Sequence, residues 1–97
     1  MSTSTLDTEC QFVATFGLTV RALREQRGWS QEVLAEQADL NRSYVGELER
    51  GKAIPSVITL RKLAGSFELS LASLMAHTES RMHDRLVQRI ELTAIAC

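Results

Sequence analysis

The chain has 97 residues, of which 44% are hydrophobic and 24% are charged, as in a soluble globular protein with one modest core. One proline, five glycines and few aromatic residues favour helices over a turn-rich β fold. No run approaches the roughly 18 apolar residues that span a membrane, and no secretory signal is recognisable. Cys10 and Cys97 are isolated thiols, which favours a reduced, cytoplasmic setting.

The net charge of −1 is unevenly distributed. Residues 41–62 carry five basic and two acidic side chains, a balance of +3, so the remaining residues carry −4. A locally basic segment on an acidic body suits a protein that presents one face to phosphate. Because solvated surfaces without a partner show similar fluctuations, charge alone leaves both interpretations open.

The first predicted element is a helix that ends near Gln26, because apolar residues recur before it every three or four positions. Residues 1–5 are expected to form a disordered leader. Gly28 stands where a left-handed residue ends a helix, and Ser30 is a natural N-cap for the next helix. The apolar stripe of the first helix consists of Phe12, Phe16, Val20 and Leu23.

Four more short helices are expected after Ser30. Asp39–Leu40 makes the turn after the second helix, Asn41 caps the third and Gly51 ends it. A fourth helix begins at Ser56 and a fifth, short one at Ser70.

Past the fifth helix, Met82, Leu86 and Ile90 recur every four residues among charges, which predicts a further amphipathic helix. The sequence therefore predicts an all-α protein, with a compact five-helix domain over residues 6–76 and a C-terminal extension over residues 77–97.

Residues 30–51 meet the demands of a helix-turn-helix unit, in which the first helix crosses the DNA backbone and the second lies in the major groove. The steep crossing needs a small residue, which Ala35 supplies. Val45 and Leu48 supply apolar anchors on the back of the second helix. Its front is polar, with Asn41, Arg42, Ser43, Tyr44 and Glu47.

The run Leu23–Ala35 (Leu-Arg-Glu-Gln-Arg-Gly-Trp-Ser-Gln-Glu-Val-Leu-Ala), followed by Glu47-Leu48-Glu49-Arg50-Gly51 and Pro55-Ser56, resembles the phage-repressor and Cro-type (xenobiotic-response-element) helix-turn-helix family. The resemblance extends over residues 16–74 and implies a lambda-repressor-like fold. The turn position that usually holds glycine in this family is Asp39. Since aspartate tolerates a left-handed backbone better than most residues, we expect the turn to survive.

The resemblance also implies roles for individual residues. Gln31 matches a phosphate-binding glutamine at the start of the second helix, with a solvated first-turn side chain as the alternative. Arg42, Ser43 and Glu47 match base-reading positions. Arg42 could bind guanine in bidentate fashion or contact a phosphate instead, and Glu47 could accept from a cytosine amine. Tyr44 could contact phosphate or a thymine methyl, or pack half-buried against the second helix.

Two further groups follow from the same resemblance. Asn41, Arg50 and Lys52 match backbone clamps around the ends of the recognition helix. In this family the glutamate before Arg-Gly pairs with an arginine of the first helix, here Glu49 with Arg24. We assign this pair to structure rather than to DNA.

No other pattern indicates catalysis or a cofactor. His77 and His83 are six positions apart, a spacing that does not place both imidazoles on one helical face. The sequence has no Gly-x-Ser-x-Gly motif, Cys/His pairing pattern or glycine-rich phosphate loop. We therefore expect no enzyme activity, metal, cofactor, small-molecule ligand or membrane partner.

The leading interpretation is a transcriptional regulator that binds a pseudo-palindromic operator in double-stranded DNA as a homodimer, because one such domain contacts few base pairs. The compact length and the run Arg42–Val45 favour a restriction–modification controller protein over a phage repressor or an antitoxin. The alternative is an antitoxin-like or protein-interaction module that keeps the fold with little DNA binding. The expected dimer interface, which could instead fold back on its own core, comprises Leu71, Leu74, Met75, Met82, Leu86 and Ile90.

Overall fold

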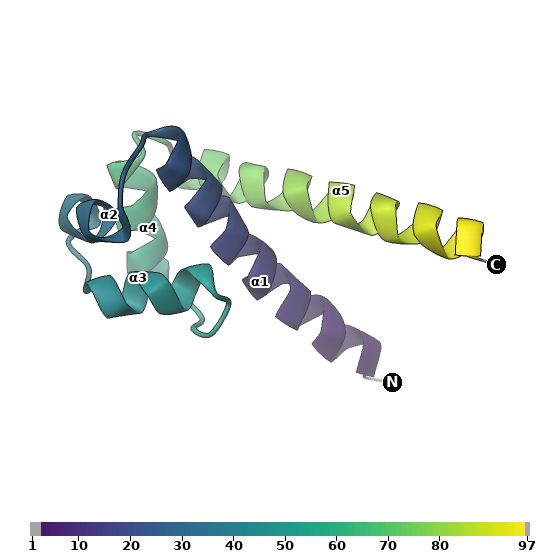
Figure 1. Cartoon of the computed structure of the whole chain (residues 1–97). Coiled ribbons are helices and arrows are strands. Elements are labelled where there is room, and N and C mark those ends of the chain that lie inside the picture. Colours follow the sequence, from purple (N-terminus) through teal and green to yellow (C-terminus); the bar gives the residue numbers. More distant parts are fainter. Residues whose placement is uncertain (1–2, 97) are drawn as a thin grey trace.

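Two long helices and three short ones make up the computed structural model, which describes the backbone of residues 3–96 and the side chains of residues 8–84. α2, α3 and α4 gather at one end, and α1 and α5 run from them toward the two termini (Figure 1). The predicted all-α fold is confirmed. The helices are α1 (Thr3–Gln26), α2 (Gln31–Ala38), α3 (Arg42–Glu49), α4 (Val57–Ser66) and α5 (Leu71–Ala96).

α1 begins earlier than its apolar stripe suggests. Residues 3–5, which were expected to belong to a disordered leader, are the first residues of α1, whereas residues 1–2 lie outside the described residues. No glycine or proline precedes Gly17, so nothing in the sequence stops the helix from extending toward the N-terminus by one hydrogen bond per residue.

The four helices after α1 begin where their capping residues were predicted. In each case a side-chain oxygen accepts a hydrogen bond from a backbone N–H in the first turn, at 2.8–3.1 Å. Such a bond satisfies one of the N–H groups that a helix start leaves without a partner. The caps are Ser30, Asn41, Ser56 and Ser70.

The first four helices all end on a left-handed residue. In each, the N–H of the following residue donates to the carbonyl five positions back, at 2.8–3.1 Å, which is the Schellman arrangement. Gly28 was predicted in this role, and the predicted turn at Asp39 is also confirmed. The left-handed residues are Gly28 (φ 69°), Asp39 (φ 55°), Gly51 (φ 71°) and Glu68 (φ 58°).

A lysine of α4 holds the turn between α2 and α3. The Lys62 ammonium donates to the carbonyl oxygen of Asp39 at 3.2 Å and lies 3.6 Å from its carboxylate. An aspartate at this left-handed position therefore gains an ionic contact that glycine would lack.

All five helices contribute to one core. Burial of the apolar side chains of this core is the main favourable contribution to the stability of the short helices, since helices this short are marginal on their own. The buried apolar residues are Phe16, Val20, Leu23, Leu34, Ala35, Ala38, Val45, Leu48, Leu63, Ala64, Phe67 and Leu74.

α1 and α3 approach closely at Gly17. A Cβ atom at this position would overlap the carbonyl oxygen of Leu48 and lie 2.7 Å from that of Glu49. Any side chain here would therefore push the C-terminal end of α3 away from α1. This role of Gly17 was not predicted from the sequence, because the contact joins segments that are far apart in the chain.

α5 is one continuous helix, so the predicted fifth helix and the predicted extension are a single element. Its sequence contains no glycine or proline that could end it after Leu74. The expected placement of Leu74 in a dimer interface is wrong, because its side chain is fully buried in the core of its own protomer.

The other residues of the expected interface divide into three groups. Met75 is half-buried and packs against the core, and the sulfur of Met82 accepts a hydrogen bond from the Thr15 hydroxyl of α1 at 3.5 Å. Leu71 is exposed. The side chains of Leu86 and Ile90 lie outside the described residues.

Candidate nucleic-acid interface

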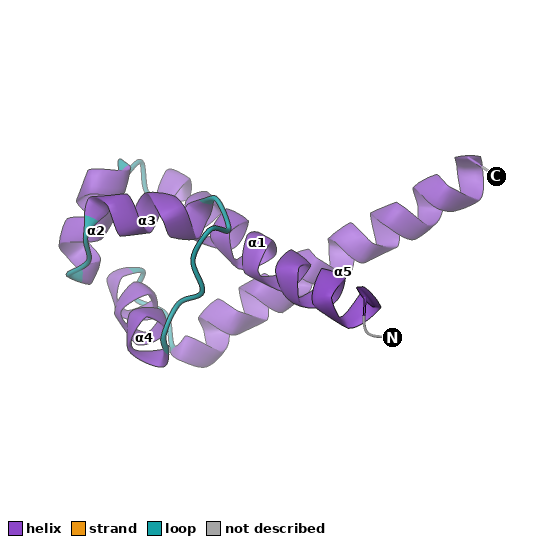
Figure 2. Ribbon diagram, turned by 90° about the horizontal axis from the view of Figure 1, so that it is seen from below, coloured by secondary structure: helices purple, strands orange, loops and turns teal. Residues whose placement is uncertain are grey.

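α2 and α3 form the helix-turn-helix pair, with α3 at the surface of the domain (Figure 2). Ala35 of α2 is buried where the two helices pack, and Val45 and Leu48 bury the back of α3. This arrangement leaves the opposite face of α3 free to contact a partner.

Polar side chains occupy the outer face of α3. Arg42, Ser43 and Glu47 are all exposed, and their spacing along an eight-residue helix places them on one side of it. Arg50, directly after the helix, and Lys52 in the following loop are exposed as well. The structure thus places three of the predicted contact residues on one face of α3 and two more, both exposed, directly after its end.

Tyr44 is directed toward the protein rather than fully outward. Its side chain is half-buried against the core, and its hydroxyl donates to the Thr59 hydroxyl of α4 at 3.4 Å. The half-buried alternative therefore describes this residue, although its hydroxyl contact is with α4 and not with the predicted second helix.

Arg24 and Glu49 form the expected ion pair between α1 and α3. Nε and Nη2 of Arg24 donate to the two carboxylate oxygens at 2.7 and 3.0 Å, and Nη1 donates to the carbonyl of Trp29 at 2.8 Å. The hydrogen bonds with Glu49 raise the pKa of the Arg24 guanidinium above its ordinary value. A bidentate pair of this kind fixes both distance and orientation, so it sets the position of α3 relative to α1.

Gln31 joins the same network from the start of α2. Its Nε2 donates to a carboxylate oxygen of Glu49 at 3.0 Å, and its side chain is half-buried. An amide nitrogen carries two N–H donors, so one donor remains beyond this bond. Gln31 was expected at phosphate, and its bond to Glu49 was not predicted.

Asn41 is exposed and caps α3, with its Oδ1 accepting from the N–H of Ser43 at 2.8 Å. The cap uses only the oxygen of the amide, and the nitrogen remains a donor. Capping and a backbone contact are therefore compatible in this residue.

Arg27 has a structural role that was not predicted from the sequence. Its guanidinium donates to the carbonyls of Phe67 at 2.6 Å and of Leu23 at 3.2 Å, and it lies 4.9 Å from the centre of the Phe67 ring. It therefore binds the C-terminal carbonyls of α1 and α4 together. An arginine in the residues that end a helix is a signal for such a contact.

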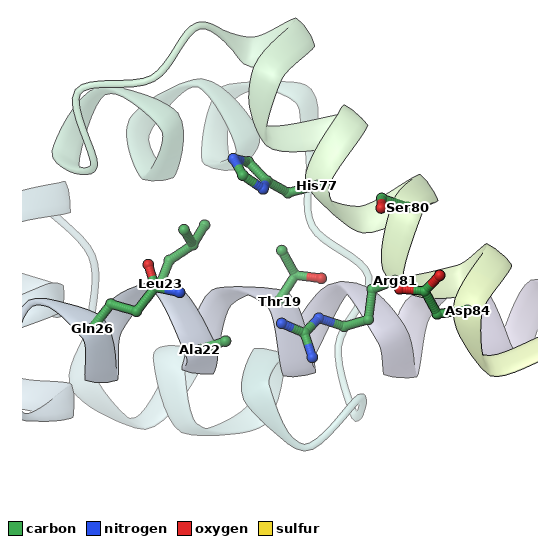
Figure 3. Close-up of a pocket in the computed structure, with 8 residues that line it drawn as sticks. All are labelled: Thr19, Ala22, Leu23, Gln26, His77, Ser80, Arg81 and Asp84. Atoms are coloured by element: carbon green, nitrogen blue, oxygen red, sulfur yellow. The ribbon is translucent and has the colours of Figure 1, made fainter. Parts of the chain in front are cut away.

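A groove lies between α1 and α5, away from the helix-turn-helix pair (Figure 3). His77 lines this groove, and His83 is an exposed residue outside it. Among the described residues, no group of three or more His, Cys, Asp or Glu side chains is placed to hold a metal ion. In the same part of the chain, no helix is both long and apolar enough to cross a membrane.

The helix-turn-helix family profile matches residues 20–74, and the chain belongs to this family. It is 36% identical over 61 residues to the immunity repressor protein of Bacillus phage phi105, covering 63% of this chain and 42% of the repressor. It is 34% identical over 65 residues to control protein C.MunI of a Mycoplasma species, covering 66% of this chain and 88% of that protein.

A solved structure gives the same result. The restriction-modification controller protein C.AhdI of Aeromonas hydrophila superposes with a TM-score of 0.62 at 40% sequence identity, covering 64% of this chain and 94% of that one. The chain spans less than half of the length of the phage repressor and most of the length of the two control proteins.

Proposed function

We propose that this protein is a sequence-specific DNA-binding transcriptional regulator that inserts α3 into the major groove. The observation that carries the proposal is the outer face of α3, where Arg42, Ser43 and Glu47 are exposed on a helix whose back is buried. The Arg24–Glu49 ion pair fixes that helix to α1. A rigid element that presents polar side chains is what direct readout of base edges requires.

The contacts divide into base-reading and backbone-positioning groups. Arg42 could donate to guanine O6 and N7, and Glu47 could accept from a cytosine amine, while Ser43 could bond with several bases. Lys52, Arg50, Asn41 and the second Nε2 hydrogen of Gln31 are suited to phosphate oxygens. The relatives that share this fold include a phage repressor and restriction–modification control proteins, which supports an operator as the target.

A homodimer is part of the proposal, because a single recognition helix contacts too few base pairs for genomic specificity. A two-fold dimer would place two recognition helices in successive major grooves, about 34 Å apart. The exposed Leu71 and the sequence positions of Leu86 and Ile90 on the same helix make α5 the proposed contact.

Binding-site selection from random DNA, followed by a salt titration of the selected site, tests the proposal. A dimer that contacts several phosphates should lose affinity steeply, with a log–log slope of about −0.9 per phosphate contacted. A protein-interaction module would select no site, and absence of binding to any duplex at low salt would refute the proposal.

Two variants separate the contact classes. Arg42→Ala should lose about 1–3 kcal/mol of discrimination at one base position, because a bidentate contact to guanine is removed. Lys52→Ala should weaken selected and random duplexes by the same factor and flatten the salt slope, because it removes only a phosphate contact. If Arg42→Ala behaved like Lys52→Ala, Arg42 would be a phosphate contact instead.

A further inference from the structure

Gly46 lies on α3 between two arginines of the outer face. Positions 42, 46 and 50 follow one another at four-residue intervals, which places them along one stripe of the helix. Arg42 and Arg50 are exposed, but Gly46 is buried. Something must therefore cover the backbone at this point of an otherwise open face.

Two side chains cover Gly46. A Cβ atom at this position would lie 3.1 Å from Nη1 of Arg50 and 3.5 Å from Oε1 of Gln31. The missing side chain thus leaves a notch, defined by Gly46, Arg50 and Gln31, that is bordered by the arginine from the end of α3 and by the glutamine from the start of α2.

The charges around the notch leave Arg50 available. The nearby Glu49 carboxylate already accepts two hydrogen bonds from Arg24 and one from Gln31. Within the part of the chain whose side chains are described, the ion pairs join Arg21, Arg24 and Lys62 to acidic partners and do not include Arg50. The guanidinium of Arg50 therefore lies over Gly46 without a carboxylate partner among the described side chains.

We propose that Gly46 is a positioning residue that seats Arg50 beside Gln31, so that α2 and α3 together bind one phosphate of the DNA backbone. The proposal rests on the proposed DNA-binding function. A mobile arginine side chain on the protein surface loses rotamer freedom when it binds, whereas an arginine side chain already placed in a notch loses less. Seating the side chain before contact should therefore strengthen binding.

The surroundings of Gly46, and not its position inside a helix alone, support the proposal. Glycine inside a helix is unfavourable relative to alanine, because it orders a more flexible backbone. Gly65 in the interior of α4 has the same disadvantage, but no atom lies within 4 Å of a Cβ built there. Gly65 is therefore a matched control in which a side chain would fill open space.

The test is a double-mutant cycle with the full chain, measured by fluorescence anisotropy on the selected duplex over a range of salt. We expect Arg50→Ala to weaken binding about tenfold, as for a lost charged hydrogen bond, and to flatten the salt slope by about 0.9 per protomer. Gly46→Leu should produce the same two changes, because its side chain fills the notch and expels Arg50.

The decisive variant combines Gly46→Leu with Arg50→Ala. It should bind no more weakly than Arg50→Ala alone, because the leucine then has no arginine to displace. Gly65→Leu should bind like the wild type. Thermal melting checks the fold, and if Gly46→Leu does not fold, Gly46→Ala takes its place with a loss of about threefold. Alanine should also raise the Tm by roughly 3–8 °C, as helix propensity predicts.

Two results would overturn the inference. Wild-type affinity in Gly46→Leu would show that the notch does not affect binding. If the double variant bound more weakly than Arg50→Ala by the same factor that Gly46→Leu loses alone, the leucine would be blocking DNA directly. If the wild type itself bound no duplex, the proposed function would fail and the inference with it. This last result is distinguished from the others by the wild-type titration alone.

Discussion

The position of α3 relative to α1 and α2 depends on the buried carboxylate of Glu49. Its side chain is 3% exposed and accepts hydrogen bonds from Arg24 and Gln31. We expect Arg24→Ala to lower the free energy of unfolding by about 3–5 kcal/mol, because removing one partner leaves a buried charge uncompensated. Urea denaturation followed by circular dichroism measures this loss.

A second arginine–glutamate pair on the same helix provides the control. Arg21 and Glu25 also form an ion pair at 3.1 Å, but their side chains are 58% and 55% exposed. Arg21→Ala should therefore cost less than about 0.5 kcal/mol. If Arg24→Ala left stability unchanged and abolished DNA binding, Arg24 would belong to the DNA interface and not to the scaffold.

The pH dependence of this pair follows from the direction of the Arg24 shift. The pKa of its guanidinium is raised in the folded state, so its contribution is fully present below the unfolded value and is lost only as the pH rises through the higher folded value. Because arginine stays protonated at any ordinary pH, we expect no loss of stability from Arg24 between pH 5 and pH 9. This expectation would be contradicted if the midpoint of urea denaturation fell between pH 5 and pH 9 in the wild type but not in Arg24→Ala.

The sequence allowed the ion pair to be predicted but not the second partner of the carboxylate, Gln31. The pairing of Arg24 with Glu49 follows from a family motif with fixed spacing. The bond from Gln31 depends on how closely the start of α2 approaches the end of α3. That distance is set by the way α2 and α3 cross, which is not visible in local sequence.

The helix ends show a second limit of local reasoning. Gly28 could be predicted to end α1 because glycine adopts the left-handed conformation without cost. Glu68 carries no such signal, and yet it ends α4 with φ 58°. There the core residue Phe67 directly precedes it, and the need to bury that ring fixes the backbone in spite of the unfavourable residue type.

The strain at Glu68 gives a prediction about the end of α4. A left-handed conformation costs an L-residue about 1–2 kcal/mol, and glycine removes this cost. Glycine also raises the conformational entropy of the unfolded chain, which lowers the free energy of unfolding by roughly 0.4–1 kcal/mol. We therefore expect Glu68→Gly to raise stability by up to about 1 kcal/mol, measured as a higher midpoint of urea denaturation.

Gly28→Ala provides the opposite case at the end of α1. Gly28 has φ 69°, and no atom lies within 4 Å of a Cβ built there, so backbone strain alone should lower stability by about 1 kcal/mol.

A loss of stability in Glu68→Gly would show that the glutamate side chain makes a contact that outweighs the strain.

At the scale of the whole molecule, the first part of α5 belongs to the core, and the proposed dimer contact lies further along the same helix. Its first part closes the core through Leu74 and packs on α1 through Met82, while the helix continues to Ala96 beyond the helical cluster (Figures 1 and 2). The sequence showed an apolar stripe along this helix, but a stripe cannot distinguish a core face from a dimer face. Only the position of α1 and α4 decides that Leu74 is internal.

This division predicts different responses to protein concentration. Leu74→Ala removes a buried side chain and should cost about 2–5 kcal/mol at every concentration. Replacing Leu86 and Ile90 together with glutamate should convert the proposed dimer into a monomer, because two charges per protomer would have to be buried at the contact. In the wild type, the Tm should rise with protein concentration, and this rise should vanish in the double glutamate variant but persist in Leu74→Ala.

Sedimentation velocity and DNA binding complete this test. The double glutamate variant should sediment as a monomer, bind the full operator more weakly than the wild type, and bind an isolated half-site equally well, because its recognition helix is intact. A variant that still sedimented as a dimer would place the contact elsewhere. A variant that lost half-site binding would show that the end of α5 supports the fold, since α3 lies at the opposite end of the protomer from the C-terminus (Figure 1).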